Sequence, residues 1–294
     1  MNKKLLITGG SGFIGRNLCK KLLETQEFDF ISPDSKEIDI TKKETFALLF
    51  ADEIFHVIHL AGKVFVPDSW INPDDFITVN AFGTKNMLEF CRRYNISLTY
   101  ISTYLYGQPE HIPIDEEAPV KVNNPYAFSK HLAEQLCSFY AQEYGVKIII
   151  LRLFNIYGPG QKEKLLIPHI IKQCISDKEI IVEDILPKRD YVYVDDFINL
   201  LLSSIKQVDS INSNYEIFNV GSGYSMSVAE IIDTVQNILG TTKNVVSKKN
   251  KRKNEINDVV ADISKIRKYF KWEPKYTFEQ GIAETIDYYG TKLI

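Results

Sequence analysis

The feature that most constrains the fold is a glycine-rich turn near the start of the chain. Residues 4–8 form a short, mostly apolar run, and Gly9, Gly12 and Gly15 follow at intervals of three. Apolar residues then recur every fourth position over residues 14–22, which is helical spacing. The order strand, glycine turn, helix predicts the first unit of a βαβ fold.

The glycines also indicate what such a turn can bind. Glycines at Gly9, Gly12 and Gly15 allow a tight turn and close approach of the backbone to a ligand. The N-terminus of the following helix offers N–H groups and a positive dipole end to a pyrophosphate. The spacing Gly-x-x-Gly-x-x-Gly differs from the commoner Gly-x-Gly-x-x-Gly, so a purely structural turn remains the alternative.

Further along the chain, apolar strands alternate with helical segments. Strands are predicted at residues 28–31, 57–61, 98–102 and 146–154, and helices at residues 75–94 and 125–144. This alternation predicts an α/β fold with a parallel, doubly wound sheet. Regular alternation stops after residue 160. We therefore predict a first domain over residues 1–155, with returning segments near 190–220, and a smaller lobe over residues 156–294.

Composition excludes several classes of protein. The net charge of −3 gives no general attraction to nucleic acid or anionic membranes. No apolar stretch has the length of a membrane span, and the first one ends at Thr8, too early for a signal peptide. The four cysteines and five histidines lack the spacing of metal ligands. We expect a cytoplasmic protein with reduced thiols and no bound metal.

A tyrosine and a lysine four positions apart are the main candidates for catalysis. Asn124 can cap a helix and Pro125 suits its first turn, so Tyr126 and Lys130 should share one helical face. A phenol has a pKa near ~10, and a neighbouring ammonium favours the phenolate and lowers that pKa. The spacing is common, so a surface pair on an amphipathic helix is the alternative.

Ser102 is a further candidate because it ends a predicted strand. Ligands of open parallel sheets bind beyond the carboxyl ends of the strands. A hydroxyl at Ser102 can therefore reach a substrate oxygen beside the Tyr126 phenol. A hydroxyl that satisfies a turn is the equally open alternative.

Several segments together resemble the extended short-chain dehydrogenase/reductases, and among them the nucleotide-sugar-modifying NAD-dependent epimerase/dehydratase family. The matching segments are residues 8–15, 59–62, 102–107, 126–130, 152–160, 189–196 and 219–223. They occur in the family's order, from residue 3 to about residue 281. The resemblance implies a Rossmann-type doubly wound parallel sheet with a smaller C-terminal substrate-binding lobe.

The resemblance also implies roles for individual residues. Ser102, Tyr126 and Lys130 match the catalytic set, in which Tyr126 exchanges a proton with a sugar hydroxyl or ketone and Lys130 tunes it. The implied cofactor contacts are Gly9, Gly12, Phe13, Ile14, Gly15, Asp39, Ile40, Leu60, Ala61, Gly62, Asn80, Tyr126 and Lys130. The implied contacts to the sugar and its diphosphate are Ser102, Tyr126, Asn155, Arg189 and Arg252.

The two residues after Ser102 bear on which reactions of the family are possible. The 4,6-dehydratases of this family carry an acidic pair there, whereas this chain has Thr103 and Tyr104. The fucose-forming epimerase–reductases place a cysteine where Tyr104 stands. The resemblance therefore argues against dehydration and against proton exchange at neighbouring carbons.

The segment after the second predicted strand bears on the cofactor. The stretch up to Asp39 is short, as in the 4-keto-sugar reductases, while typical 4-epimerases have a longer insertion and a strand-end acid for the adenosine ribose. Asp34 is not assigned as that acid. Ser32, Ser35 and Lys36 are candidates to accept a 2′-phosphate, which favours NADP, with NAD as the alternative.

These points predict an NAD(P)-dependent oxidoreductase that reduces the C4 ketone of a nucleotide-linked 4-keto-6-deoxyhexose. The first alternative is a nucleotide-sugar 4-epimerase, which uses the same residues and retains its cofactor. The second is a non-catalytic, dinucleotide-binding sensor protein on the same fold. From the resemblance we also expect a homodimer through a four-helix face formed by residues 75–94 and 125–144.

Overall fold

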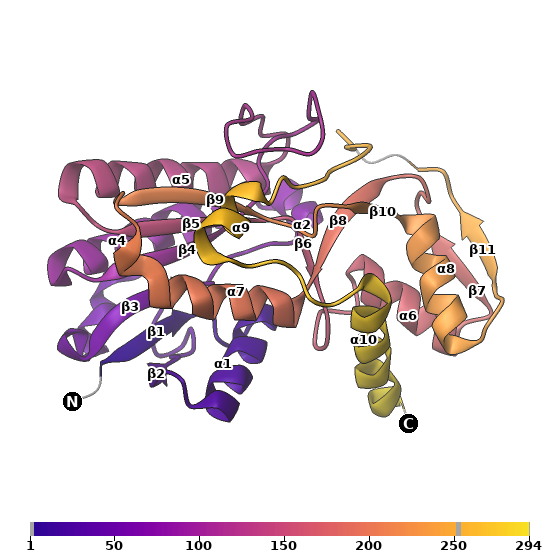
Figure 1. Cartoon of the computed structure of the whole chain (residues 1–294), viewed down its shortest axis with the longest axis horizontal. Coiled ribbons are helices and arrows are strands. Elements are labelled where there is room, and N and C mark those ends of the chain that lie inside the picture. Colours follow the sequence, from indigo (N-terminus) through magenta and orange to yellow (C-terminus); the bar gives the residue numbers. More distant parts are fainter. Residues whose placement is uncertain (1–2, 251–253, 294) are drawn as a thin grey trace. The chain divides into compact units, whose positions relative to one another are not determined.

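The chain forms two compact units. Figure 1 shows the whole chain, coloured from the N-terminus to the C-terminus. The structure is a computed structural model that describes residues 3–250 and 254–293. The first unit comprises Met1–Gly107, Pro119–Leu153 and Leu200–Phe218. The second comprises Gln108–Ala118, Phe154–Asn199 and Asn219–Ile294. Each unit is a discontinuous stretch of sequence, because the chain crosses between them several times.

A six-stranded sheet forms the centre of the first unit. Its order is β2 (Phe30–Ile31), β1 (Lys4–Thr8), β3 (Ile54–His59), β4 (Ser97–Thr103), β5 (Ile148–Leu153) and β9 (Tyr215–Val220). The pairings from β2 through to β5 are all parallel. The α/β class and the parallel sheet predicted from the sequence are confirmed. The second strand is shorter than predicted, because only two of its residues pair with β1.

Helices cover both faces of this sheet. Leu6, Leu98 and Ile150 pack in one cluster with Met87 of α4 (Gly83–Tyr94) and Cys137 of α5 (Pro125–Tyr144). The strand residues between these are buried too but point to the other face, where α1 (Phe13–Thr25) lies. Figure 1 shows α5 and α1 on opposite sides of the strands. This double burial is the reason the strands are continuous apolar runs.

The helix predicted over residues 75–94 is interrupted. It consists of α3 (Pro73–Phe76), a π-helical turn η3 (Ile77–Phe82) and α4, and the short α2 (Val66–Ile71) precedes it. A π turn widens the helix by one residue, which apolar periodicity does not reveal. The remaining short helices of this unit are η1 (Lys43–Leu48), η2 (Ala51–Glu53) and η4 (Val208–Ser210).

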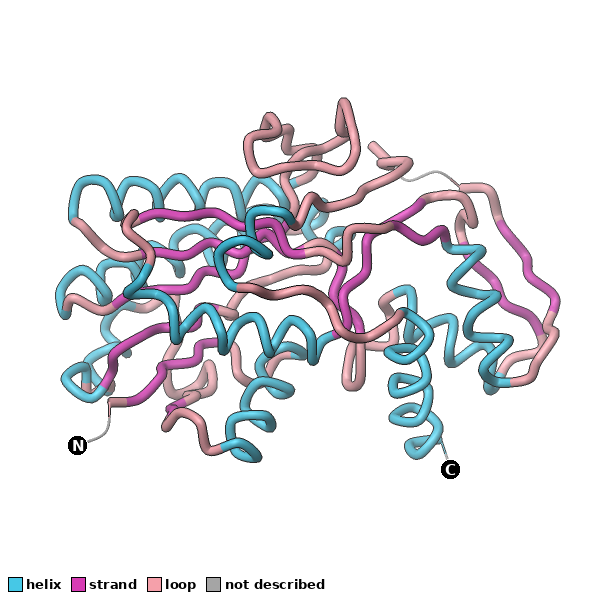
Figure 2. Tube along the Cα trace, viewed as in Figure 1, coloured by secondary structure: helices cyan, strands magenta, loops and turns pink. Residues whose placement is uncertain are grey.

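The second unit contains two small sheets, drawn as separate strands in Figure 2. One has the order β10 (Ser225–Ser227), β8 (Lys188–Tyr193), β6 (Asn155–Tyr157), and the other pairs β11 (Asn244–Ser247) with β7 (Glu179–Val182). Its helices are α6 (Leu166–Ser176), α8 (Val228–Leu239), α9 (Ser264–Phe270) and α10 (Phe278–Leu293), and α7 (Val194–Gln207) leads back to the first unit. Segments near residues 190–220 were expected to return to the first domain. Strand β8, at the start of that range, pairs with β6 and β10 of the second unit.

Candidate active site

The glycine turn after β1 is built so tightly that two of its residues leave no room for a side chain. Gly9 has φ +75°, and a Cβ on it would lie 2.6 Å from the Ala61 nitrogen. A Cβ on Gly15 would lie 2.3 Å from the Gly9 oxygen. The turn therefore packs directly against the loop that follows β3, and only glycine permits that approach.

The first turn of α1 is open to an anion. Gly12 is its N-cap and donates its N–H to the Gly9 oxygen at 3.0 Å, while Phe13 and Ile14 begin the helix. No side chain caps this helix, and no acidic residue lies in its first turn. Uncapped amides and the positive dipole end together favour a phosphate group. The turn thus fits the pyrophosphate of a dinucleotide.

The loop after β3 connects this turn to the predicted catalytic residues. Leu60 donates its N–H to the Thr8 oxygen at 3.1 Å, which places Ala61 over Gly9. A Cβ on Gly62 would lie 2.9 Å from the Asn80 Oδ1 and 4.0 Å from the Lys130 Nζ. The predicted cofactor residues of this loop are therefore close to Lys130.

Helix α5 begins where the sequence predicts. The Asn124 side chain accepts the Ala127 N–H at 2.8 Å, and Pro125 occupies the first turn. Tyr126 and Lys130 follow on one face, four residues apart. The predicted cap and helix start are confirmed.

The ammonium of Lys130 points towards β4. Its Nζ donates to the Ile101 oxygen at 2.5 Å and lies 4.3 Å from the centre of the Tyr100 ring. Only 5% of Lys130 is exposed, and this burial lowers its pKa to about 7, although the Glu134 carboxylate opposes the shift. Lys130 therefore anchors α5 to the end of β4.

The pKa of the Tyr126 phenol is raised, whereas the sequence predicted that Lys130 would lower it. Burial raises its pKa to about 12, a hydrogen bond with the Thr103 side chain opposes that rise, and Lys130 is not among the causes. The ammonium does not lower this pKa because it is directed at the Ile101 carbonyl. The ring also packs edge-on against Phe76, with centroids 6.3 Å apart. At neutral pH the Tyr126 phenol is protonated and suited to donate a proton.

Ser102 lies between the two strand residues that contact Lys130 and Tyr126. It is 3% exposed, and its Oγ has no hydrogen-bond partner among the described residues. A buried hydroxyl without a partner costs free energy, and a ligand oxygen would satisfy it. Ser102, Tyr126 and Lys130 thus meet at the carboxyl end of β4.

A buried ion pair stands next to this cluster. The Arg152 guanidinium donates to both oxygens of Glu134, with the shortest contact at 2.7 Å, and to the Tyr106 hydroxyl at 2.9 Å. Arg152 pairs with Ser102 in the β4–β5 register, and Glu134 follows Lys130 by one turn of α5. The pair links the helix that carries Tyr126 to the strand next to Ser102.

In the turn after β2, Asp34 bonds through its carboxylate to the backbone of that same turn. Its carboxylate accepts the N–H groups of Lys36 at 2.7 Å and Glu37 at 3.1 Å, so it closes its own turn. Ser32 packs against the glycine turn instead, because a Cβ on Gly10 would lie 1.8 Å from its hydroxyl. A hydroxyl therefore lies beside the glycine turn.

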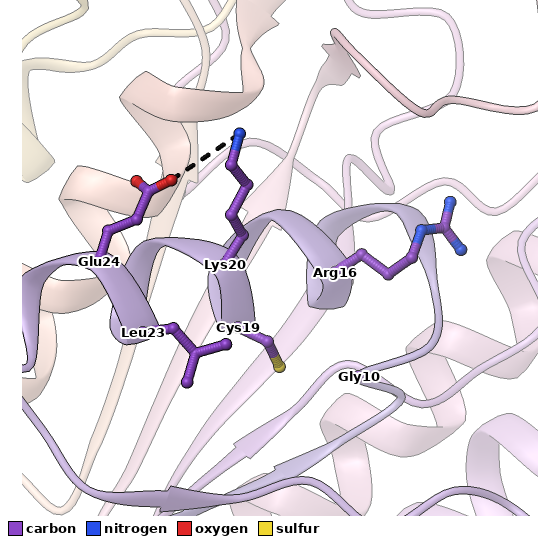
Figure 3. A pocket seen from close by; sticks show the side chains of 6 residues that line it. All are labelled: Gly10, Arg16, Cys19, Lys20, Leu23 and Glu24. Carbon is purple, nitrogen blue, oxygen red and sulfur yellow. Dashed lines mark ion pairs between the residues drawn. The ribbon is translucent and has the colours of Figure 1, made fainter.

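A pocket of about 500 Å³ adjoins this corner (Figure 3). Its lining residues are Gly10, Arg16, Cys19, Lys20, Leu23 and Glu24. The Arg16 side chain extends along the start of α1 and donates to the Ser11 oxygen. A cation therefore lies beside the glycine turn, although the sequence did not lead us to name Arg16.

The two predicted adenine contacts have structural partners. The Asp39 carboxylate accepts from the Thr41 N–H and hydroxyl, at 3.0 and 2.7 Å, and these bonds lower its pKa. Ile40 is 8% exposed and lies against Gly83 of α4. Contact of either residue with adenine stays a prediction.

The predicted substrate residues lie in the second unit. The Asn155 amide donates to the Asp190 oxygen at 3.1 Å. Arg189 donates to the Ile256 oxygen at 2.7 Å and forms an ion pair with Glu255. Arg252 lies outside the described residues. Arg189 therefore fastens the segment that follows Arg252 to β8.

Several residues of the site were not singled out from the sequence. They are Thr103, which bonds with the Tyr126 phenol, Ser129, Thr84 and Arg16. Arg16 and Ser129 lie next to named residues, Thr103 was noted only for the acid it replaces, and Thr84 had no signal in the sequence. Within the described part of the chain, no group of His, Cys, Asp and Glu is arranged to hold a metal ion. Over the same residues, no helix is long and apolar enough to cross a membrane.

Comparisons with known proteins identify close similarities over the whole chain. Residues 5–221 match the model of the NAD dependent epimerase/dehydratase family. A putative UDP-glucose 4-epimerase of Methanocaldococcus jannaschii is 29% identical, with 97% of each chain covered. A GDP-6-deoxy-D-mannose reductase of Pseudomonas aeruginosa is also 29% identical, over 100% of this chain and 99% of the relative. The solved structure of RMD from Pseudomonas aeruginosa with NADPH has a TM-score of 0.89 and 26% identity, covering 99% of this chain and 100% of that one.

Proposed function

The chain belongs to the NAD dependent epimerase/dehydratase family, and on that premise we propose that it reduces the C4 ketone of a nucleotide-linked 4-keto-6-deoxyhexose. The observation that carries the proposal is the cluster at the end of β4. It combines a protonated phenol at Tyr126, a hydroxyl without a partner at Ser102 and an anchored ammonium at Lys130. A ketone that accepts a hydride requires such a proton donor.

A nicotinamide dinucleotide is the cofactor, and the residues of the first unit fit it. The turn at Gly9 and Gly15 excludes side chains, so the backbone can approach a pyrophosphate closely. The uncapped first turn of α1 would bind its phosphates, and the loop at Ala61 and Gly62 would support the rest of the molecule. When bound, the reduced cofactor supplies the hydride.

The residues of the chain provide binding and proton transfer. Tyr126 delivers its proton to the ketone oxygen as that oxygen becomes a hydroxyl, and solvent restores the phenol. Ser102 donates a hydrogen bond to the same oxygen and stabilises the negative charge that develops on it. Lys130 holds the end of β4 in place through its hydrogen bond to the Ile101 oxygen.

The resting protonation state of Tyr126 is the one that a reduction requires. Epimerisation begins with oxidation of a hydroxyl, for which Tyr126 must act as a base. A pKa of about 12 keeps the phenol protonated at neutral pH, which is the form that a reduction starts from, whereas an oxidation would first require the phenolate. The similarity to a GDP-6-deoxy-D-mannose reductase supports the same direction.

The 4-epimerase remains the second candidate. It is supported by the similarity of this chain to a putative UDP-glucose 4-epimerase. Such an enzyme would use Ser102, Tyr126 and Lys130 for both the oxidation and the return of the hydride. It would need no added cofactor, which separates it experimentally from a reductase.

We propose NADPH as the preferred cofactor. An acid at the end of β2 would repel a 2′-phosphate, and Asp34 is occupied by its own turn. Ser32 beside Gly10 offers a hydroxyl, and Arg16 offers a guanidinium close to the same turn. Both groups suit a phosphate. NADPH bound to the similar structure from Pseudomonas aeruginosa supports this choice.

In the second unit, Asn155, Arg189 and Arg252 are proposed to bind the sugar and its diphosphate. The Arg189 side chain is 16% exposed, and the Glu255 carboxylate and the Ile256 oxygen fix its direction, so a diphosphate would have to compete with Glu255 for the guanidinium. The planar fork of an arginine matches a diphosphate in geometry and charge. Arg189→Lys should therefore weaken substrate binding while NADPH binding stays unchanged.

A homodimer through α4 and α5 is also part of the proposal. Aromatic side chains gather at the ends of these helices, where Tyr94, Phe139 and Tyr144 are 47%, 50% and 51% exposed. Such exposed aromatic groups are typical of interfaces. Light scattering should report a dimer, and Phe139→Glu should yield a monomer. A monomeric wild-type protein at micromolar concentration would refute this interface.

The function is tested by absorbance at the reduced-nicotinamide band. NADPH is mixed with the protein and with nucleotide-linked 4-keto-6-deoxyhexoses that differ in nucleotide. A substrate-dependent loss of absorbance, matched one-to-one by alcohol product, establishes the reductase. Interconversion of ordinary nucleotide-hexoses without added cofactor would instead establish the epimerase. Neither reaction, with NADPH still bound, would favour the sensor.

A further inference from the structure

A path of hydrogen bonds through two buried side chains, Asn80 and Ser129, joins the loop after β3 to helix α5. Its central residue is Asn80, which is 1% exposed and lies in the π-helical turn η3. The Asn80 Oδ1 accepts the Lys63 N–H at 2.8 Å, and its Nδ2 donates to the Lys63 oxygen at 2.9 Å. The amide thus binds both polar groups of one residue in the loop, as a neighbouring strand would.

The same amide reaches α5 through a serine. The Asn80 Nδ2 also donates to the Ser129 Oγ at 2.9 Å, and this hydroxyl donates to the Tyr126 oxygen at 2.7 Å. Ser129 is completely buried. The bond between Asn80 and Ser129 joins two buried side chains, so leaving either group without its partner would cost free energy.

The main-chain oxygen of Asn80 is also held by a hydrogen bond. The Thr84 hydroxyl donates to the Asn80 oxygen at 2.6 Å, so it must accept from the His59 Nε2 at 3.1 Å. His59 therefore carries its proton on Nε2, and its Nδ1 accepts from the Thr8 hydroxyl at 2.7 Å. Thr8 in turn accepts the Ala61 N–H at 3.3 Å. The path closes on the loop from which it started.

Two further observations indicate that Asn80 is held in one place. Burial lowers the pKa of His59 to about 3, so the histidine stays neutral and its hydrogen bonds keep one direction at all ordinary pH values. The π-helical turn is itself a rare feature that commonly occurs at functional sites. The loop at residues 61–63 is therefore fastened from both ends.

We propose that Ser129 is a positioning residue, which ties the placement of Tyr126 to the loop at residues 61–63 through Asn80. The inference rests on the proposed function only in taking Tyr126 as the proton donor. Since Ser129 holds the main chain of Tyr126 and not its ring, its loss leaves the phenol intact but less well placed. Displacement by about an ångström is sufficient to slow a reaction strongly.

The test compares two buried serines with the same local bond. Ser204 is also fully buried and donates to the Leu201 oxygen three residues earlier at 2.8 Å, but no asparagine among the described residues bonds to it. Ser129→Ala should lower kcat by about ten- to a hundredfold. The KM for the sugar and the Kd for NADPH should stay within about twofold of wild type, because less than about 0.4 kcal/mol is involved. Ser204→Ala should leave kcat unchanged.

A second readout does not depend on turnover. Hydrogen exchange is followed with and without NADPH in peptides that contain residues 60–66 and 124–131. In the wild type, NADPH should slow exchange in both peptides. In Ser129→Ala the first peptide should still be protected and the second should lose most of its protection. Asn80→Ala breaks the same link from its other end and should give the same loss in the second peptide.

The outcomes separate the two proposals. Equal protection of both peptides in Ser129→Ala, or equal loss of kcat in Ser204→Ala, would overturn the positioning role. A wild-type protein that reduces no sugar but shows coupled protection would overturn the proposed reaction and leave the link between loop and helix established. If Ser129→Ala does not fold, Asn80→Ala decides the result by the same exchange measurement.

Discussion

The Nζ of Lys130 donates a hydrogen bond to the main-chain oxygen of Ile101 at 2.5 Å, and so fastens the catalytic helix to the strand that ends in Ser102. This contact changes the role expected for the lysine. The Lys130 ammonium interacts with the Ile101 carbonyl and with the face of the Tyr100 ring, whose centre is 4.3 Å from its Nζ. Burial, and not this ammonium, sets the pKa of Tyr126.

Lys130→Met should make the protein more stable and inactive. Burial lowers the pKa of Lys130 to about 7, from 10.5 when unfolded. Below pH 7 both states carry the proton, and the folded state bears the full cost of a buried cation. Between pH 7 and 10.5 the unfolded state binds more protons, so wild-type stability rises with pH. The variant should gain about 1 to 3 kcal/mol in urea unfolding at pH 6. The gain should shrink as pH rises; the exposed Lys20→Met should show no such trend.

Tyr126→Phe should abolish turnover while the protein still binds cofactor. The phenol is the proton donor in the proposed reaction, so kcat should fall by about 10²- to 10⁴-fold. The ring still packs against Phe76, so thermal stability should change little. The half-exposed Tyr144→Phe on the same helix is the control. Retained turnover in Tyr126→Phe, measured at the reduced-nicotinamide band, would assign the proton to another group.

Arg16→Ala should weaken NADPH binding selectively. If the guanidinium beside the glycine turn binds the 2′-phosphate, its loss should raise the Kd for NADPH about tenfold, the equivalent of one charge-assisted hydrogen bond. The Kd for NADH should not change. Lys20→Ala, from the same wall of the pocket, provides a matched control for lost positive charge. Equal weakening of NADPH and NADH would place Arg16 at the pyrophosphate.

Glu134→Gln should destabilise the fold severely. The variant leaves the buried Arg152 without its counter-ion, and breaking a buried pair costs about 3 to 5 kcal/mol. The exposed pair of Lys172 and Glu163 offers the comparison, where Glu163→Gln should cost less than about 0.5 kcal/mol. Urea unfolding measures both. A loss below about 1 kcal/mol for Glu134→Gln would mean that Arg152 finds water or another partner.

Gly9→Ala should cost more than the same change at another left-handed glycine. Gly145 has φ +70° with open space around it, so Gly145→Ala should cost about 1 kcal/mol from backbone strain alone. At Gly9 the added carbon also meets the Ala61 nitrogen at 2.6 Å, which should bring the total to about 3 kcal/mol or more. Equal unfolding free energies for the two variants would show that the loop after β3 yields easily. NADPH binding should be lost only in Gly9→Ala.

The local elements were predicted well because their signals are local. The run at β1, the glycines after it and the cap at Asn124 each act within a few residues, and all appear where expected. The predictions were wrong where the local structure depends on contacts with segments distant in the sequence. The π-helical turn η3 and the two-residue strand β2 depend on neighbours across the fold. The role of Asp34 stays untested, and the hydrogen bonds within its own turn became visible only in the structure.

By itself the sequence determined the α/β class, the glycine turn and the identity of Ser102, Tyr126 and Lys130 as candidates, because residue type and spacing carry that information. Only the tertiary structure decided which atoms these side chains meet. Lys130 bonds to Ile101, the Tyr126 ring packs against Phe76, and the Ser102 hydroxyl has no partner among the described residues. These outcomes depend on burial and on distances between segments far apart in the chain. Such quantities set pKa values and hydrogen bonds, and no local pattern encodes them.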